Sequence, residues 1–161
     1  MKKLIYILLI SFSSCISSKD DSFSEKNLIM SQSFLDNLLT NTEEAKKSLH
    51  EDFTFSWMGN IEQGGKIWNK ETLFNDYLPI IGEILPKGII LNTVDAIADS
   101  EGVALIQEGD AEGKNGEYDN KYVWIFKMKE GLIFSIREYN SDILVATQLY
   151  DYEIENINIS K

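Results

Sequence analysis

The spacing of apolar residues changes from helical to strand-like along the chain. In residues 25–39 the apolar side chains recur mostly three, four or seven positions apart, which is typical of one stripe of an amphipathic helix. A second, short helix is predicted to begin at Thr42. A third lies in residues 69–88, with Asn69 as its cap and a kink at Pro79. The N-terminal half of the domain is therefore predicted to be mainly helical.

Alternating apolar and polar positions predict the strands. In residues 52–59, Phe53, Phe55 and Trp57 alternate with smaller polar residues, as expected for a half-buried strand. After Pro86 the period stays at two, and the remaining elements are strands at 88–99, 102–113, 117–129 and 131–142 and a short helix at 141–150. This order indicates an α+β fold, a cone in which about three N-terminal helices cover a curved antiparallel sheet of about four to six strands.

The N-terminus has the pattern of a bacterial leader. Two lysines precede an apolar run from Leu4 to Ile10, much shorter than the about 20 residues that a membrane span needs. The motif FSSC resembles the lipobox of lipoproteins, so residues 1–14 are predicted to be a signal peptide and Cys15 the site of lipidation. The alternative is an ordinary secreted protein with an unpaired cysteine in its discarded leader.

The rest of the chain divides into a linker, one domain and a tail. Residues 15–24 are polar and rich in serine, which predicts a flexible tether. The motif SKDD within them resembles the signal that sends some lipoproteins to the outer face of the outer membrane, although a soluble linker is an alternative. Residues 25–149 form the domain, and residues 150–161 are a tail or an extra edge strand. We therefore expect an outer-membrane lipoprotein that faces the periplasm or the cell surface.

Charge and composition exclude several functions. The chain has 161 residues and a formal net charge of −11, and loss of the leader makes it more negative because two lysines go with it. Such a surface repels phosphate backbones, so nucleic-acid binding is disfavoured. With one histidine, His50, and one cysteine, the chain lacks the ligands of a multi-histidine or thiolate metal site. We expect neither a metal nor a cofactor.

The last predicted hairpin brings the aromatic residues to one face. If it turns at Glu130-Gly131, counting along an unbroken ladder places Trp124 opposite Arg137, the only arginine of the chain. The same count places the residue pairs Tyr122 with Tyr139 and Phe126 with Ser135 on that inner face. The outer face then carries Val123, Ile125, Phe134, Ile136 and Glu138.

This inner face is the predicted ligand site. Arg137 would stack on Trp124 or hold a ligand carboxylate there, and a structural cation paired with Glu108 or Asp110 is the alternative. The guest is expected to be a small apolar or amphipathic molecule. The predicted ligand-binding residues are Trp57, Tyr77, Glu108, Tyr122, Trp124, Phe126, Arg137 and Tyr139.

Two segments resemble a known family. FLDNLLTNTEEAKKSLHEDFTFSWMG and EYDNKYVWIFKMKEGLIFSIREYNSD resemble the SnoaL-like branch of the NTF2-like superfamily, over about Glu25 to Leu149. The resemblance implies a cone-shaped α+β fold, a pocket between helices and sheet, and frequent dimers formed through the sheet. The superfamily includes ketosteroid isomerases, polyketide cyclases and limonene-epoxide hydrolases, whose catalytic residues can be matched to positions in this chain.

The catalytic sets of those enzymes are not retained in full at the matching positions. The isomerases' aspartate falls on Trp57 and their tyrosine on Ser33. Of the hydrolases' set, Asp110 is kept, but the arginine is lost and the second carboxylate falls on Ser141. Three hypotheses therefore stay open. The first is a ligand-binding lipoprotein, the second is an isomerase or hydrolase with Asp110 or Glu108 as general base, and the third is a dimeric interaction module paired through Val123, Ile125, Phe134 and Ile136.

Overall fold

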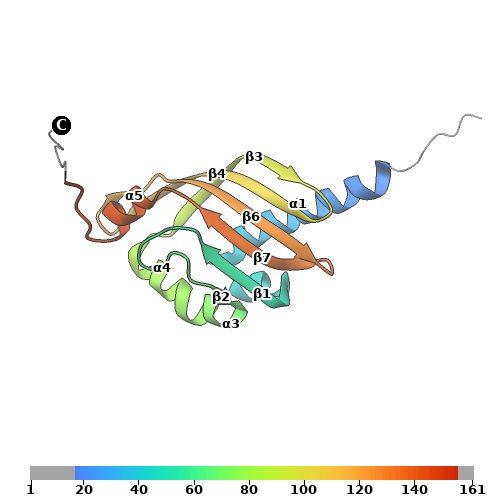
Figure 1. The fold of residues 1–161 in the computed structure, drawn as a ribbon, viewed down its shortest axis with the longest axis horizontal. Helices are drawn as coiled ribbons and strands as arrows, with labels where there is room; N and C mark the ends of the chain where they lie inside the picture. Colours follow the sequence, from blue (N-terminus) through green and yellow to red (C-terminus); the bar gives the residue numbers. More distant parts are fainter. Residues whose placement is uncertain (1–16, 156–161) are drawn as a thin grey trace, which may run out of the picture.

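The fold is a curled β-sheet with helices on its concave side (Figure 1). The structure is a computed structural model that describes residues 17–155. The strand order is β2-β1-β7-β6-β4-β3, with β5 paired to β4 beside this path. The strands are β1 (Leu49–Trp57), β2 (Trp68–Asn69), β3 (Ile89–Ala98), β4 (Gly102–Gly113), β5 (Gly116–Glu117), β6 (Lys121–Lys129) and β7 (Leu132–Tyr139).

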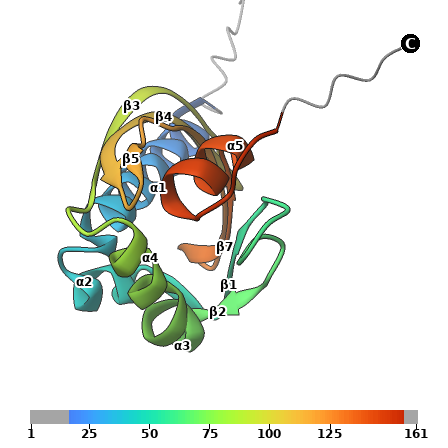
Figure 2. The same cartoon turned by 90° about the vertical axis from the view of Figure 1, so that its left-hand side faces the viewer.

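The helices lie within the curve of the sheet and at one end of it. Seen along the strands, the sheet arcs around α1, α3 and α4, with α5 in front (Figure 2). This arrangement confirms the predicted α+β cone. The helical segments are α1 (Ser17–Leu38), α2 (Thr42–Lys47), α3 (Lys70–Thr72), the π-helical turn η1 (Leu73–Tyr77), α4 (Leu78–Ile84), α5 (Asp142–Leu144) and a second π-helical turn, η2 (Val145–Leu149).

The sheet is mixed rather than wholly antiparallel. The first long strand, β1, lies parallel to the last, β7, whereas the pairs β3–β4, β4–β6 and β6–β7 are antiparallel. Hydrophobic periodicity identifies a strand but does not identify its neighbours, so this pairing between distant segments escaped the sequence prediction.

The predicted flexible tether is partly helical. The described part of α1 begins at Ser17 and runs to Leu38 without a glycine or proline, so the prediction for residues 15–24 is wrong over 17–24. In Figure 1 this part of the helix extends beyond the sheet, and Phe23 in it is 52% exposed. Apolar periodicity marks only the packed part of a helix, which explains the late predicted start. The predicted signal peptide and Cys15 lie outside the described residues.

The third helix begins and bends where the sequence predicts. The Asn69 side chain accepts a hydrogen bond from the backbone N–H of Thr72, and the Thr72 hydroxyl lies 3.0 Å from the Asn69 backbone nitrogen, which completes a capping box. The predicted kink is the π-helical turn η1, which ends just before Pro79 in the first turn of α4. Proline is tolerated there because that turn does not need its N–H.

A bulge in β7 changes the register of the last hairpin. The hairpin turns at Glu130-Gly131 as predicted, with φ values of 54° and 78° that glycine adopts readily at the second position. Lys129 lies opposite Leu132 and Met128 opposite Ile133, but Lys127 then lies opposite Ser135. Phe134 is the extra residue on β7, and every later side chain of that strand points to the face opposite to the one predicted.

The predicted orientation of Arg137 is therefore wrong. Arg137 lies opposite Ile125 on the exposed outer face, and Tyr139 is 42% exposed there too. Glu138 takes the inner position opposite Trp124 and is only 8% exposed. The predicted outer residue Ile136 lies in the core, so of the proposed pairing surface only Val123, Ile125 and Phe134 remain partly exposed, and the dimer stays a prediction.

Aromatic packing closes one end of the cone. Phe126 is fully buried, and its ring meets the Phe34 ring of α1 edge-on at 6.4 Å. The ring of Phe53 lies at the same separation from the Phe34 ring and is tilted against it. Along β6 the inward residues beyond Phe126 are Trp124 and then Tyr122, so the space beneath the sheet opens from Phe126 toward Tyr122.

Within residues 17–155 no helix is long and apolar enough to cross a membrane.

Residues 150–155 follow η2 without forming a strand. In this segment the Tyr152 hydroxyl donates a hydrogen bond to Glu62 Oε1 at 2.8 Å. The predicted extra edge strand is thus not formed by residues 150–155, and residues 156–161 lie outside the described part.

Candidate functional site

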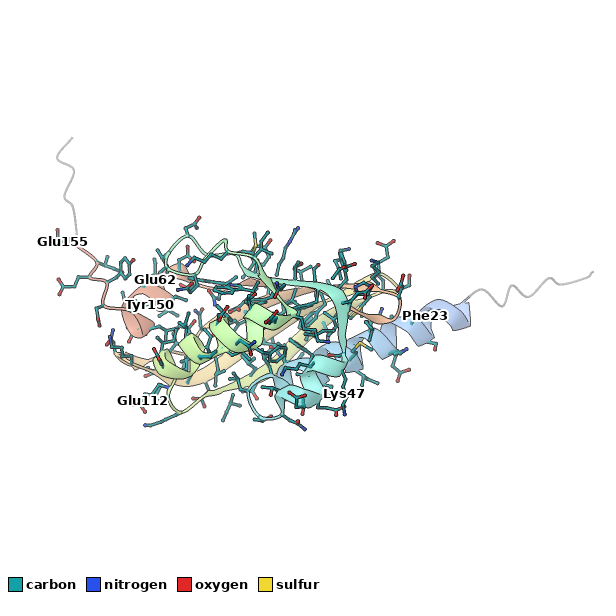
Figure 3. The ribbon with its side chains drawn as sticks, turned by 90° about the horizontal axis from the view of Figure 1, so that it is seen from below. Phe23, Lys47, Glu62, Glu112, Tyr150 and Glu155 are labelled. Carbon is teal, nitrogen blue, oxygen red and sulfur yellow. The ribbon has the colours of Figure 1, made fainter. Side chains whose placement is uncertain are left out.

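A cavity of about 370 Å³ lies between the concave face of the sheet and the helices α1, α4 and η2. Figure 3 looks onto α4 from below, and Tyr150, one of the lining residues, lies at the end of the molecule where Glu62 also lies. Most of the wall is aliphatic or aromatic. The residues that line the cavity include Trp57, Tyr77, Ile81, Tyr118, Tyr122, Trp124, Glu138 and Asn140.

Three side chains form a row across the inner face of the sheet. Trp57 on β1 is the direct neighbour of Glu138 on β7, and Glu138 is the direct neighbour of Trp124 on β6. Side chains at directly paired positions lie on the same face and about 5 Å apart at their Cβ atoms. The Glu138 side chain therefore lies between those of the two tryptophans on this face.

Asn140 fixes this carboxyl in place. Its Nδ2 donates a hydrogen bond to Glu138 Oε1 at 2.9 Å, and its Oδ1 accepts one from Trp57 Nε1 at 2.8 Å. Because an indole nitrogen can only donate, the Trp57 contact orients the Asn140 amide so that its NH₂ group faces the glutamate. Trp57 thus acts on Glu138 through Asn140.

Burial makes Glu138 an unusual acid. Burial raises the pKa of the Glu138 carboxyl from 4.5 to about 8, and the hydrogen bond from Asn140 offsets part of that rise. At neutral pH most Glu138 side chains are therefore protonated, and the group donates as well as accepts a hydrogen bond.

Buried tyrosines surround the acid. Burial raises the pKa of Tyr118 to about 12 and raises the pKa of Tyr77 and Tyr122 further above the ordinary value, with the charge of Glu138 acting in the same direction. Tyr118 accepts a hydrogen bond from Asn120 Nδ2 at 3.0 Å. All three phenols stay neutral at physiological pH and offer hydroxyl groups in an apolar wall.

The second indole of the row has a free donor. Trp124 is 6% exposed and stacks on Tyr122 at a ring separation of 5.6 Å, and its Nε1 has no hydrogen-bond partner within residues 17–155. Trp57, by contrast, uses its N–H to hold Asn140. Buried donors without a partner are rare, and the Trp124 side chain lines the cavity, so this N–H is the donor that a bound molecule would satisfy.

The structure brings together half of the residues predicted for the site. Trp57, Tyr77, Tyr122 and Trp124 line the cavity, whereas Phe126 is packed in the core below it. The other three predicted binding residues do not reach the cavity. Glu108 is exposed, and its Oε1 lies 3.3 Å from Lys121 Nζ. Arg137 and Tyr139 lie on the outer face.

The enzyme hypothesis loses both of its predicted bases. Asp110, like Glu108, is an exposed outward residue of β4, so neither carboxylate has the buried position that the hypothesis requires. The acid in the cavity is Glu138, which the unbroken ladder had placed outside. A signal for the bulge was present, since Ile133 and Ile136 are both large and apolar but three residues apart, an odd spacing for one face of a strand.

No group of three or more histidine, cysteine, aspartate or glutamate side chains in the described part of the chain is arranged to hold a metal ion. The chemistry that this cavity offers is that of an apolar wall with one buried carboxyl, Glu138, one indole N–H without a partner among the described residues and several neutral hydroxyls. Such a set can hold a polar group of a guest or exchange a proton with it.

Comparisons with known proteins identify the fold. No protein-family model and no curated protein matches the sequence. PrhC from Penicillium brasilianum is 14% identical, with 78% of this chain and 87% of that chain aligned at a TM-score of 0.67. An NTF2-like protein from Burkholderia xenovorans is also 14% identical, with 78% and 97% aligned at a TM-score of 0.64.

A further similar structure belongs to the SnoaL-like group. A protein from Jannaschia sp. CCS1, named a SnoaL-like polyketide cyclase, is 11% identical, with 81% of this chain and 96% of that chain aligned at a TM-score of 0.65. Similarity at such low identity concerns the fold and not the reaction. Residues 17–155 therefore adopt the cone-shaped α+β fold of NTF2-like proteins, as the two resembling segments predicted.

Proposed function

We propose that this domain binds a small apolar or amphipathic molecule in the cavity beneath its sheet. The observation that carries the proposal is a cavity of about 370 Å³ whose apolar wall contains a buried carboxyl, Glu138, beside an unpaired indole N–H, Trp124. Its size lies within the range of about 300–1,000 Å³ usual for small-molecule sites, and an apolar wall with a few convergent polar groups is their usual composition.

A neutral fluorescent probe tests the proposal. N-phenyl-1-naphthylamine brightens in apolar surroundings, and we expect saturable, one-to-one binding to the purified domain at pH 7. Ile81→Trp places a larger side chain in the cavity wall and should weaken binding at least tenfold. Ile97→Trp is the matched control, because Ile97 is 70% exposed on β3 and should leave the affinity unchanged. No saturable binding, or equal binding by both variants, would contradict the proposal.

A second candidate is an acid–base enzyme in which Glu138 replaces the predicted Asp110 and Glu108. The observation that favours it is the raised pKa of Glu138, about 8, because a general base works best when its pKa lies near the working pH. In this candidate the ionised fraction of Glu138 takes a proton from a carbon next to a carbonyl, and the Trp124 N–H stabilises the oxygen of the enolate.

Isotope exchange distinguishes this candidate from simple binding. In D₂O, an enzyme of this kind should exchange the methyl protons of 2-acetonaphthone faster than buffer does. The rate should rise with pH up to about 8 and then level off, since that is the pKa of the base. Glu138→Gln should abolish the excess rate while probe binding persists. Exchange no faster than in buffer would leave binding as the function.

We also propose that Cys15 is lipidated and anchors the domain to the outer membrane, on the periplasmic or the cell-surface side. The support is the FSSC motif behind a short apolar run. In a bacterial host, the wild-type protein should fractionate with membranes and incorporate a labelled fatty acid. Cys15→Ser should do neither, and labelling that survives this substitution would contradict the anchor.

A further inference from the structure

The polar groups of the cavity define what the guest must offer. We propose that the guest is an uncharged molecule that presents an acceptor oxygen, as a ketone, ester or amide carbonyl does, to the Trp124 N–H and the Glu138 carboxyl together. This inference rests on the proposed ligand-binding function and specifies its chemical class.

The first observation is the unused donor. Trp124 Nε1 is buried and has no hydrogen-bond partner among residues 17–155, although its side chain lines the cavity. An indole nitrogen can only donate, so the complementary group on a guest must be an acceptor. The neighbouring Trp57 N–H is not available, because Asn140 accepts its hydrogen bond at 2.8 Å.

The second observation is the position of the acid. Glu138 and Trp124 are direct cross-strand partners on the inner face, so one guest atom can reach both side chains. Asn140 donates to Glu138 Oε1, and within the described residues no other hydrogen bond to this side chain is found, which leaves Oε2 for the guest. A protonated carboxyl donates through that oxygen, and two converging donors suit the two lone pairs of a carbonyl oxygen.

The third observation is the charge of the wall. The charged or ionisable acids that line the cavity are Asp36 and Glu138, and no lysine or arginine lines it in the described part of the chain. A guest carboxylate would be buried without a cation to pair with, which is strongly unfavourable. Anionic amphiphiles are therefore excluded, and Arg137, the cation expected to hold them, faces away.

A cationic guest is the competing solution, because aromatic rings beside a carboxylate also suit an amine. The affinities of a neutral acceptor and of an amine should change in opposite directions with pH. The groups that face Glu138 are Asn140, the indoles of Trp57 and Trp124, and the phenols of Tyr77, Tyr118 and Tyr122. Apart from Glu138, none of these groups titrates below pH 9. A neutral acceptor therefore binds best while Glu138 is protonated, and an amine binds best once Glu138 is ionised.

Displacement of N-phenyl-1-naphthylamine by four naphthalenes of similar size tests the class. At pH 6.5, 2-acetonaphthone should bind about tenfold more tightly than 2-isopropenylnaphthalene, in which a CH₂ group replaces the oxygen, as expected for two net hydrogen bonds. The carboxylate 2-naphthoate should bind at least a hundredfold more weakly than the ketone, and 2-naphthylmethylamine no more tightly than the hydrocarbon.

Variants assign this preference to the two side chains. Trp124→Phe should reduce the tenfold preference for the ketone to about threefold, because one of the two hydrogen bonds is lost, while leaving hydrocarbon affinity within twofold. Trp68→Phe is the matched control, because it also deletes a buried indole N–H without a partner, but one outside the cavity wall. Raising the pH from 6.5 to 9 should weaken ketone binding several-fold in the wild type and leave it unchanged in Glu138→Gln.

The outcomes separate this inference from the function on which it rests. Equal affinity for the ketone and the hydrocarbon, tight binding of the carboxylate, or an amine that binds most tightly above pH 8 would each overturn the inference while the binding function stands. Failure of all four compounds and of the probe would overturn the function itself. The ligand comparison uses the wild-type protein, so it remains decisive if Trp124→Phe does not fold.

Discussion

Replacing Glu138 with glutamine should make the domain more stable than the wild type at neutral and mildly alkaline pH. The glutamine side chain has nearly the same shape, and its carbonyl oxygen can still accept the hydrogen bond that Asn140 donates to Glu138 Oε1 at 2.9 Å. It lacks the carboxyl proton, so the substitution isolates the cost of keeping an acid in an apolar wall.

The direction follows from the pKa of the folded state, about 8, against 4.5 for the unfolded chain. Between these values the folded state holds a proton that the unfolded state has lost, so wild-type stability is fully present below pH 4.5 and is lost as the pH rises toward 8. Each pH unit in this window is worth about 1.4 kcal/mol. From pH 5.5 to pH 8 the wild type should lose about 3 kcal/mol relative to the glutamine variant.

Urea unfolding followed by tryptophan fluorescence measures this difference. The free energies of unfolding of the wild type and of Glu138→Gln are determined at half-unit steps from pH 5.5 to pH 8. The quantity of interest is the difference between the two proteins, because contributions from every other ionisable group are shared and cancel. A loss of about 3 kcal/mol is a large part of the about 5–15 kcal/mol that stabilises a typical domain.

A difference that stays constant across this pH range would refute the reasoning. It would mean that Glu138 titrates alike in the folded and unfolded states, and hence that water reaches the carboxyl freely. A difference that grows as the pH falls would reverse the sign and would require Glu138 to be ionised and paired in the folded protein.

Four other predictions concern single positions. Phe126→Ala should cost about 3–5 kcal/mol in urea unfolding, because Phe126 fills the closed end of the cone; a loss below about 1 kcal/mol would contradict that packing. Gly102→Ala should lower the melting temperature, since a Cβ atom there would collide with the backbone oxygen of Phe126 on β6, and an unchanged melting temperature would argue against this close approach. Arg137→Ala and Asp110→Asn should each change stability by less than about 0.5 kcal/mol and leave probe affinity unaltered, because both side chains are exposed; a tenfold loss of affinity in either would restore it to the site. Asn140→Ala should raise the pKa of Glu138 above 8 in a carboxyl ¹³C NMR titration, because it removes the hydrogen bond that lowers it, and a downward shift would rule out this role.

The sequence predicts this fold well because local signals decide most of it. The Glu130-Gly131 turn, the cap at Asn69 and the alternation of Tyr122, Trp124 and Phe126 are each set by neighbours in the chain, and the structure has all three. The parallel neighbour of β1 is different, since it depends on how segments far apart in the chain pack together. Periodicity carries no information about that choice.

The site is only half predictable for the same reason. The inward residues of β6 were found by counting, but Phe134 enters β7 as an extra residue and reverses the two faces of that strand from there on. One bulge thus replaces the expected cation, Arg137, with an acid, Glu138, on the inner face, so the site lacks the group that was expected to hold a ligand carboxylate. Such a bulge must be seen in the sheet, although the odd spacing of Ile133 and Ile136 points to it.

The indole N–H signals of the three tryptophans give the most direct test of the account. They lie in an uncrowded region of a ¹H–¹⁵N spectrum and can be assigned from Trp→Phe variants. On addition of 2-acetonaphthone at pH 6.5, the Trp124 signal should move downfield as its N–H gains an acceptor, while the Trp68 signal stays in place. An unmoved Trp124 signal at saturating ketone would contradict a guest seated between that indole and Glu138.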